Sequence, residues 1–362
     1  MRVLRLWLID FRNYTEVEVE PAPNGLTAIV GANGEGKTNL LEAVGYLATL
    51  SSFRGAPGAA LVREGCTSAV VRAEVEREGR DVLLEAQLAV TGRDRVLVNR
   101  QPLRRTRDLL GALRVSVFSP DDLVLVKGAP SGRREFLDDT VVALHAKHDA
   151  LRSDVDRILR QRGALLKQAG GRLTAEIEST LDVWDTKLAT AGQALVDARQ
   201  ETLAVIEPEV VKAYGQLAGT GAVVSLRYLQ SWTGDLLAAL GASRTDDLRR
   251  AATLVGPHRD DVVLAIDGLP ARTHASQGEQ RSLALALRLA AHRAVADLTG
   301  TPPVLLLDDV FSELDPTRCE ALIAHIPDRQ ALVSTTGLLP SAARPDRVLV
   351  VRAGTVTRQE GS

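Results

Sequence analysis

The sequence predicts an α/β protein with a mixed sheet around a phosphate-binding loop, an antiparallel layer beside it, and an inserted helical lobe. Residues 31–38 read GANGEGKT and fit the pattern G-x-x-x-x-G-K-[ST]. An Asn24-Gly25 turn and a short apolar run over residues 26–30 precede this phosphate loop, which indicates a buried strand. Apolar residues after the loop fall on one helical face, so strand, loop and helix follow in the required order.

The residues of the phosphate loop suit an anionic ligand. Glycines let backbone N–H groups turn inward, and the dipole of the following helix favours phosphate. We expect Lys37 to reach the β and γ phosphates of a nucleotide as a catalytic group, and Thr38 to ligate Mg²⁺. The predicted nucleotide contacts are Gly31, Ala32, Asn33, Gly34, Glu35, Gly36, Lys37, Thr38 and Asn39. A Gly-rich turn arising by chance is the alternative, which the flanking strand and helix disfavour.

Alternating apolar residues predict two paired strands at the start of the chain, residues 3–8 and 17–20. Further β-rich patterns follow the loop helix, with turn signals between them. These patterns predict the antiparallel layer and cover residues 69–76, 82–90 and 95–99.

Long helical patterns cover residues 134–168 and 173–214, and strands resume at residues 222–229 and 262–267. No heptad repeat persists long enough to predict an extended coiled coil. The predicted organisation is a nucleotide-binding head in two halves with a mainly helical lobe inserted between them: residues 1–118, 255–362 and 119–254, respectively.

The composition is that of an ordinary globular protein. The 362 residues carry a net charge of −2 and are 45% hydrophobic, without an apolar run of membrane-spanning length. We therefore expect a cytoplasmic protein with no membrane partner. Cys66 and Cys319 are too few for a disulfide framework or a zinc site, so both are expected to be reduced packing residues. An aromatic content of 3% argues against a base-stacking platform for single strands.

Two acidic residues follow the apolar run over residues 304–307. At the carboxyl end of a strand in such a sheet, side chains face the ligand crevice. We expect Asp308 to hold Mg²⁺ and Asp309 to orient or deprotonate the attacking water. Because adjacent strand residues point to opposite faces, both can act only if the strand ends near Asp308 and the backbone turns. An acidic pair that merely caps a strand end is the alternative.

Residues 276–280, SQGEQ, precede a strongly helical run. Ser276 and Glu279 fit an S-x-x-E capping box, which alone explains both residues. A capped helix start also exposes N–H and hydroxyl donors, so Ser276 and Gly278 are further candidates for nucleotide contact. Their order and spacing relative to the acidic pair match the signature motif of ABC-type ATPases, usually LSGGQ. In those proteins the signature of one subunit closes over ATP held by the other.

Together these motifs resemble the RecF family of bacterial recombination mediators, which are ATPases of the ABC and SMC type. The specific part of the resemblance lies in residues 256–261 (GPHRDD) and 118–123 (FSPDDL), and it covers almost the whole chain. It implies an ABC-type ATPase head with a short helical lobe, ATP and Mg²⁺ as ligands, and weak ATPase activity. It also implies an ATP-dependent homodimer, double-stranded and gapped DNA as partners, and action with RecR and RecO to help RecA load.

Three departures from the ABC pattern bear on mechanism. Residues 119–123 contain no glutamine for a Q-loop, and residues 333–336 (VSTT) lack the switch histidine of transporters, as RecF-like proteins do. Asp309 stands where many ABC proteins have glutamate, and its shorter reach predicts slow hydrolysis suited to a switch. The open alternatives are the ATP-binding subunit of a transporter, a passive DNA scaffold with structural ATP, and a small-molecule kinase, which has no use for the signature.

Residues 93–114 are the candidate DNA surface, with a net charge of +5 over 22 residues. A solvated charged face is the alternative. The arginines concerned are Arg93, Arg95, Arg100, Arg104, Arg105, Arg107 and Arg114. His258 and Arg259 either bridge the nucleotide site and the helical lobe or pair with Asp260 and Asp261.

Overall fold

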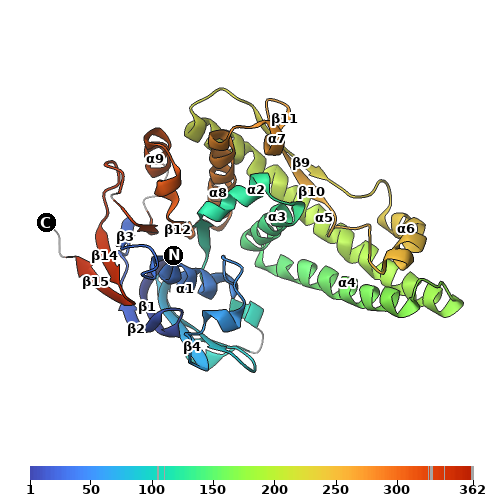
Figure 1. Cartoon of the computed structure of the whole chain (residues 1–362), viewed down its shortest axis with the longest axis horizontal. Coiled ribbons are helices and arrows are strands. Elements are labelled where there is room, and N and C mark those ends of the chain that lie inside the picture. The colour runs from blue at the N-terminus through green and yellow to red at the C-terminus, as the bar shows by residue number, and fades with distance from the viewer. Residues whose placement is uncertain (104–105, 110, 325, 327–328, 338, 360–362) are drawn as a thin grey trace. The chain divides into compact units, whose positions relative to one another are not determined.

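The computed structural model describes the chain except residues 104–105, 110, 325, 327–328, 338 and 360–362 (Figure 1). The chain forms two compact units. The first unit consists of Met1–Asp122, Gln216–Gly219 and Ala291–Ser362, and the second of Leu123–Gly215 and Thr220–Ala290. The predicted assignment of two head halves and an inserted lobe, with boundaries at residues 118 and 254, stays a prediction.

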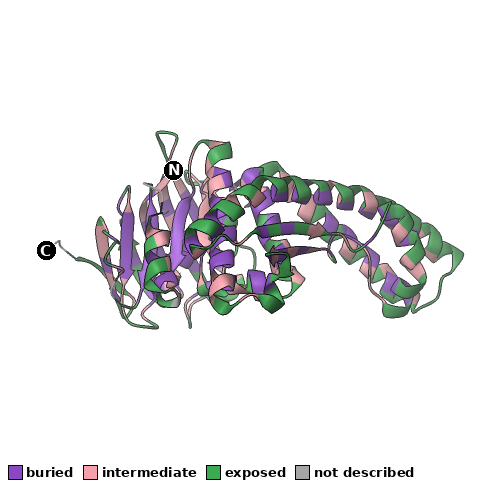
Figure 2. Ribbon diagram, turned by 90° about the horizontal axis from the view of Figure 1, so that it is seen from above, coloured by how far each residue is buried: buried purple, intermediate pink, exposed green. Residues whose placement is uncertain are grey.

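A six-stranded mixed sheet in the first unit has the strand order β15-β14-β3-β13-β12-β8. Its strands are β3 (Leu26–Val30), β8 (Val115–Phe118), β12 (Val304–Asp308), β13 (Ala331–Thr335), β14 (Arg347–Arg352) and β15 (Thr355–Gln359). All neighbouring strands are parallel except β14 and β15. Strands β3, β12 and β13 are buried almost throughout, which explains their continuous apolar sequences (Figure 2). Their carboxyl ends meet at one edge of the sheet.

A second six-stranded sheet in this unit has the order β2-β1-β4-β5-β6-β7, and all its pairs are antiparallel. Its strands are β1 (Arg2–Phe11), β2 (Tyr14–Val19), β4 (Ser68–Arg77), β5 (Arg80–Ala89), β6 (Arg95–Val98) and β7 (Gln101–Pro102). Every second residue of β4 from Ala69 to Val75 is buried, as the predicted period of two requires. The buried face shares one apolar core with helix α1 (Lys37–Thr49), so the predicted antiparallel layer supports the helix that follows the phosphate loop.

Short helical segments complete the described part of the first unit. They are η1 (Gly58–Leu61), η2 (Thr106–Leu109), η3 (Pro120–Asp122), η5 (Val310–Glu313) and α9 (Pro316–Ile323). Helix α9 begins with two standard signals, because Asp315 accepts the N–H of Arg318 at 3.0 Å and Pro316 occupies the first helical position.

The second unit is mainly helical. Its helices are α2 (Leu123–Lys127), α3 (Pro130–Leu144), η4 (Ala146–His148), α4 (Asp149–Ala169), α6 (Leu236–Arg250) and α7 (Ala271–His274). Helices α5 (Ala175–Ala218) and α8 (Gln277–Thr299) belong to it for most of their length and continue into the first unit. A small antiparallel sheet of order β11-β10-β9 contains β9 (Val224–Leu229), β10 (Asp261–Ile266) and β11 (Leu269–Pro270). Among the described residues, no helix is long and apolar enough to span a bilayer.

One helix boundary differs from the sequence patterns. Residues 134–168 were predicted as one helical stretch, but α3 ends at Leu144 because His145 has an extended backbone, with φ −138° and ψ 90°. No glycine or proline marks this break. Helix α5, in contrast, agrees with the helical pattern over residues 173–214 and continues through Pro208, although proline lacks the N–H that the helix would use there. Neither feature follows from local propensity.

A buried ion network joins three helices of the second unit. Arg162 of α4 is 0% exposed, and its Nε donates to Asp185 Oδ1 of α5 at 2.7 Å. Its Nη1 donates to Asp247 Oδ2 of α6, also at 2.7 Å. Arg244 Nε donates to the other oxygen of Asp185 at 2.8 Å. Charges removed from water are stable only when paired, so this network fixes the three helices in one arrangement.

We predict that Arg162→Met destabilises the protein by about 3–5 kcal/mol, because it leaves two buried carboxylates without their shared partner. Arg157→Met on the same helix is the matched control: Arg157 is 57% exposed, and its ion pair with Asp154 is worth under about 1 kcal/mol. Urea unfolding followed by tryptophan fluorescence measures both, since Trp232 lies in the core of this unit. Equal small losses in the two variants would contradict a stabilising role for the network.

Candidate functional site

The phosphate loop connects β3 to α1, which begins at Lys37. Gly36 has φ 114°, and a Cβ at this position would lie 2.6 Å from Asn13 Nδ2. A Cβ at Gly31 would lie 2.5 Å from the carbonyl oxygen of Val351 in β14. Gly36 is therefore required both for its backbone conformation and for close packing. Gly31 is required for close packing alone.

The turn between β1 and β2 holds the phosphate loop. Asn13 Nδ2 donates to the carbonyl oxygen of Glu35 at 2.8 Å, and the Tyr14 hydroxyl donates to that of Gly36 at 2.9 Å. Asn39 Nδ2 donates to Asn13 Oδ1 at 2.8 Å. The sequence patterns predict the two strands and do not indicate that the turn between them contacts the loop. Asn13 follows Asp10 and Arg12 in a hairpin that carries several charged residues, so the sequence does not specify the loop as the partner of its side chain.

Lys37 and Thr38 occupy the first turn of α1. Lys37 is 6% exposed, and its Nζ donates to the carbonyl oxygen of Ala32 at 2.8 Å. Burial lowers the pKa of Lys37, while the nearby carboxylates of Asp309 and Asp308 act in the opposite direction. Thr38 Oγ1 donates to Asp308 Oδ1 at 2.7 Å, which joins residues 270 positions apart. A hydroxyl and a carboxylate oxygen in contact form a donor set that fits Mg²⁺, a cation that prefers oxygen ligands.

The two acidic residues lie at the end of β12. The strand ends at Asp308, and Asp309 takes a left-handed conformation with φ 47° and ψ 27°. This is the backbone turn that the sequence analysis required for both carboxylates to act. Asp308 is 8% exposed, and burial raises the pKa of its carboxyl against the effect of hydrogen bonds from Ser334 and Thr38. Asp309 Oδ1 is buried and accepts no hydrogen bond from the described residues.

Ser334, near the carboxyl end of β13, contacts both acidic residues. Its Oγ donates to Asp308 Oδ1 at 2.7 Å and accepts the N–H of Asp309 at 2.9 Å. Strand pairing places Ser334 directly opposite Asp308. The sequence of residues 333–336 indicates only the lack of a histidine. The parallel register that brings Ser334 to the site is not visible in a local pattern.

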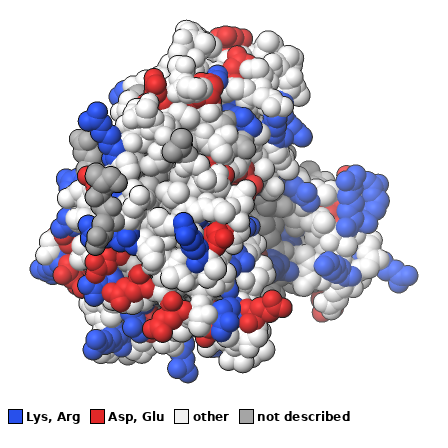
Figure 3. Space-filling model, turned by 60° about the vertical axis from the view of Figure 1, so that its left-hand side comes forward, with Lys and Arg blue, Asp and Glu red and all other residues white. Residues whose placement is uncertain are grey.

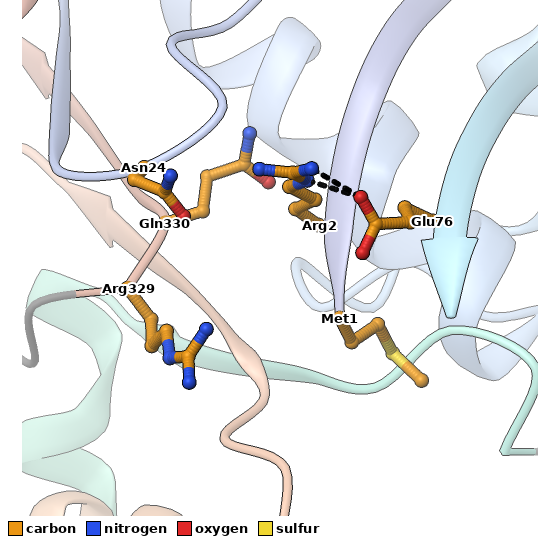
Figure 4. Close-up of a pocket in the computed structure, with 6 residues that line it drawn as sticks. All are labelled: Met1, Arg2, Asn24, Glu76, Arg329 and Gln330. Atoms are coloured by element: carbon orange, nitrogen blue, oxygen red, sulfur yellow. Dashed lines mark hydrogen bonds and ion pairs between the residues drawn. The ribbon is translucent and has the colours of Figure 1, made fainter. Parts of the chain in front are cut away.

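A pocket in the first unit lies at the other edge of the mixed sheet (Figure 4). Its volume is about 190 Å³, and it is lined by Met1, Arg2, Asn24, Glu76, Arg329 and Gln330. Asn24 and Gln330 lie just before β3 and β13, so the pocket is at the amino ends of these strands. Nucleotide sites of parallel sheets lie at the carboxyl ends. The pocket is therefore separate from the candidate nucleotide site.

The predicted signature lies at the start of α8, in the second unit. The Ser276 N–H donates to Glu279 Oε2 at 2.7 Å, and the Glu279 N–H donates to Ser276 Oγ at 3.3 Å, which is the capping box that the sequence indicated. Ser276 is exposed and Gly278 lies in the first helical turn. Their contact with a nucleotide stays a prediction, since the phosphate loop belongs to the other unit.

The motif GPHRDD has local contacts within the second unit. His258 Nε2 lies 2.9 Å from the carbonyl oxygen of Thr253, and Arg259 Nη2 donates to the same oxygen at 3.2 Å. Asp260 is 0% exposed and accepts the hydroxyl of Tyr228 at 2.7 Å. Burial lowers the pKa of His258 to about 4. The described partner of His258 and Arg259 is thus Thr253. Of the two alternatives, pairing with Asp260 and Asp261 is not seen among the described residues, and a bridge between the nucleotide site and the helical lobe stays a prediction.

The predicted DNA surface is described in part. Arg93, Arg95 and Arg100 are exposed and form no ion pair with the described residues, whereas Arg114 is half-buried. Asp94, between the first two, accepts the N–H of Ala89 at 2.9 Å. Arg104, Arg105 and the side chain of Arg107 lie outside the described part of the chain.

Comparison with known proteins identifies the family. The RecF/RecN/SMC N-terminal domain matches residues 2–339. The DNA replication and repair protein RecF of Streptomyces avermitilis is 45% identical over 380 residues, which cover 100% of this chain and 99% of the relative. The protein of the same name from Frankia alni is 43% identical over 380 residues, which cover 99% of this chain and 100% of the relative.

Solved structures show the same likeness. A recombination mediator protein RecF of the RecFOR pathway, with ATP, has a TM-score of 0.91 and 29% identity over 99% of this chain and 98% of that chain. An SMC head domain from Pyrococcus furiosus, at TM-score 0.58 and 17% identity over 100% of this chain and 96% of that chain, shares the fold alone. The fold is an α/β ABC-type ATPase head, as predicted. The chain belongs to the RecF family of DNA replication and repair proteins.

Proposed function

We propose that this chain binds ATP with Mg²⁺ at the phosphate loop and hydrolyses it slowly. The observation that carries the proposal is the hydrogen bond from Thr38 to Asp308, because it joins the phosphate loop to the acidic end of β12. The left-handed turn at Asp309 supports it, since the turn releases this side chain from the alternation of the strand. The solved RecF with ATP supports the choice of nucleotide.

The residues have distinct roles in this proposal. Loop N–H groups and Lys37 bind the phosphates, and Lys37 compensates charge that develops on the β and γ oxygens. Thr38 and Asp308 hold Mg²⁺, which neutralises phosphate charge when bound. In this proposal Asp309 accepts a proton or hydrogen bond from the attacking water, and the support is that its Oδ1 has no partner among the described residues. An aspartate reaches less far than a glutamate, which supports slow turnover.

We further propose that ATP brings two copies of the chain together, with Ser276 and Gly278 of one copy closing over ATP held by the other. The exposed start of α8 supports this arrangement, because the dipole at a helix N-terminus attracts phosphate. The rate of hydrolysis would then determine how long the dimer stays closed. In this role a slow ATPase suits a switch more than a motor.

The partners proposed for the dimer are double-stranded and gapped DNA, RecR directly, and RecO and RecA indirectly, in a cytoplasmic repair pathway that loads RecA at single-strand gaps. The RecFOR pathway of the solved relatives supports these partners. On the face shown in Figure 3, basic and acidic side chains are interspersed over much of the surface. With a net charge of −2, DNA binding must therefore depend on a local basic surface, for which we propose Arg93, Arg95 and Arg100.

Other functions of this fold fit the site less well. The ATP-binding subunit of a transporter would use the same loop and acidic pair, but β13 has Ser334 and Thr335 where transporters place a histidine. A passive scaffold with structural ATP would not need Asp309 at the site. A small-molecule kinase would not need the exposed signature.

The first prediction for this site concerns Lys37→Met, which should lower ATP affinity at least about tenfold because it removes a charge-assisted contact to phosphate. The folded protein should keep or gain stability, since burial disfavours the charged form of Lys37 and methionine carries no charge. Equilibrium binding of ATP and thermal unfolding measure the two effects. Lys167→Met, at an exposed position of α4, is the control. Unchanged ATP affinity in Lys37→Met would exclude the phosphate-loop assignment.

Two variants separate hydrolysis from dimerisation. Asp309→Asn should bind ATP yet hydrolyse it at least about 10²-fold more slowly, which traps a dimer. Ser276→Arg should bind ATP but stay monomeric, because the arginine crowds the partner's phosphates, whereas Ser276→Thr should dimerise like the parent. Light scattering with ATP reads the mass, starting from 38.8 kDa for one chain. If Asp309→Asn and Ser276→Arg behave alike, the composite site in trans is wrong.

The DNA surface predicts a salt effect. Each neutralised phosphate contributes about 0.9 to the negative slope of log affinity against log salt. Replacing Arg93, Arg95 and Arg100 by alanine should flatten the ATP-bound slope by up to about 5 in a dimer, for all DNA sequences alike. ATP hydrolysis should survive. The comparison triple is Arg157, Arg160 and Arg172 of the helical unit; if only this triple flattens the slope, DNA binds there instead.

A further inference from the structure

We propose that Ser334 is a positioning residue for both acidic side chains of the nucleotide site, an inference that rests on the proposed ATPase function. Ser334 is the fourth residue of β13 and is 1% exposed. The strand β13 lies between β3, which leads into the phosphate loop, and β12, which ends in the acidic pair. Ser334 is therefore the residue of the central strand that faces the acidic end of its neighbour.

The direction of both hydrogen bonds follows from the chemistry of the groups. An ionised carboxylate only accepts, and a backbone N–H only donates. The Ser334 hydroxyl must therefore donate its single proton to Asp308 Oδ1, at 2.7 Å, and accept from Asp309 N, at 2.9 Å. One hydroxyl thus links the carboxylate of one acidic residue to the backbone of the next, and no other proton arrangement satisfies both contacts.

The bond to the backbone of Asp309 has a specific consequence. Asp309 has φ 47° and ψ 27°, a left-handed conformation that is uncommon for residues with a Cβ, although aspartate adopts it more readily than most. Its N–H is shared between Ser334 Oγ at 2.9 Å and the Ser334 carbonyl oxygen at 3.2 Å. The shorter contact is the one to the hydroxyl. Removing the hydroxyl should loosen the turn that aims the Asp309 carboxylate, while the strand pairing itself remains.

Ser334 also helps to orient the carboxylate of Asp308. Asp308 Oδ1 accepts from both Thr38 Oγ1 and Ser334 Oγ, each at 2.7 Å. With two donors on one oxygen, the orientation of the carboxylate stays fixed even when Thr38 turns toward a cation. The neighbouring hydroxyl of Thr335 does not duplicate this role, because its described partner is the N–H of Gly337 at 3.3 Å.

A buried hydroxyl at the other end of the same sheet provides a matched control. Thr27 in β3 is 0% exposed, and its Oγ1 accepts the N–H of Ala22 at 2.8 Å. Thr27→Val and Ser334→Ala each delete one buried hydroxyl that accepts a backbone N–H and leave a side chain of similar shape. They should affect folding similarly, but only Ser334→Ala touches the acidic pair.

The experiment has two readouts, and the first needs no nucleotide. In Ser334→Ala, the Asp309 amide should exchange its hydrogen about fivefold faster than in the parent, whereas Thr27→Val and Ser334→Thr should match the parent at this amide. The second readout is steady-state ATP hydrolysis: kcat should fall about tenfold in Ser334→Ala, with ATP affinity within about threefold of the parent. Ser334→Thr, which keeps the hydroxyl, should restore kcat.

Each result decides the proposal. Unchanged exchange at Asp309 in Ser334→Ala would overturn it, as would an equal fall of kcat in Thr27→Val, which would indicate a general loss of stability. The proposal would also be overturned if Ser334→Thr, which keeps the hydroxyl, showed the faster exchange at the Asp309 amide and the lower kcat expected of Ser334→Ala. If the parent binds no ATP and hydrolyses none, the proposed function fails, and the exchange of the Asp309 amide alone decides whether Ser334 holds the turn.

Discussion

The candidate nucleotide site depends on the two hydrogen bonds that Asp308 Oδ1 accepts. A carboxylate that is 8% exposed is costly to bury unless its oxygens are paired, and here one oxygen accepts two hydroxyl donors from different parts of the chain. Those donors reach it only if β13 lies between β3 and β12 and all three run parallel. The residues of the site can therefore come together only if the sheet has this strand order.

The phosphate loop depends in the same way on segments far from it in sequence. The β1–β2 turn donates to loop carbonyls, and the carboxylate of Glu35 accepts the N–H of Ala353 in the β14–β15 turn. Behind the loop, Arg12 Nη2 donates to the fully buried Glu42 at 2.7 Å and so ties the same hairpin to α1. The antiparallel sheet thus acts as a rigid support for the loop, beyond its share of the core.

Local signals in the sequence predicted the parts of the site that depend on neighbouring residues. The glycine pattern of the loop, the capping box at Ser276 and the apolar run before Asp308 each act within a few positions, so their structural consequences could be derived. Ser334 and Asn13 could not be predicted, because their partners are set by strand register and by the approach of a distant hairpin. The break after Leu144 is a further feature that no local signal marks, since neither glycine nor proline lies there.

The charges at the site support the proposal that ATP binds here together with a cation. Lys37 supplies positive charge beside the carboxylates of Asp308, Asp309 and Glu35. Two like charges about 4 Å apart near a protein surface repel by about 4 kcal/mol, so triphosphate oxygens next to this acidic edge are unfavourable with Lys37 alone. The divalent cation proposed at Thr38 and Asp308 would turn that repulsion into attraction. Asp309 is held through its backbone N–H, and its buried Oδ1 has no hydrogen-bond partner among the described residues.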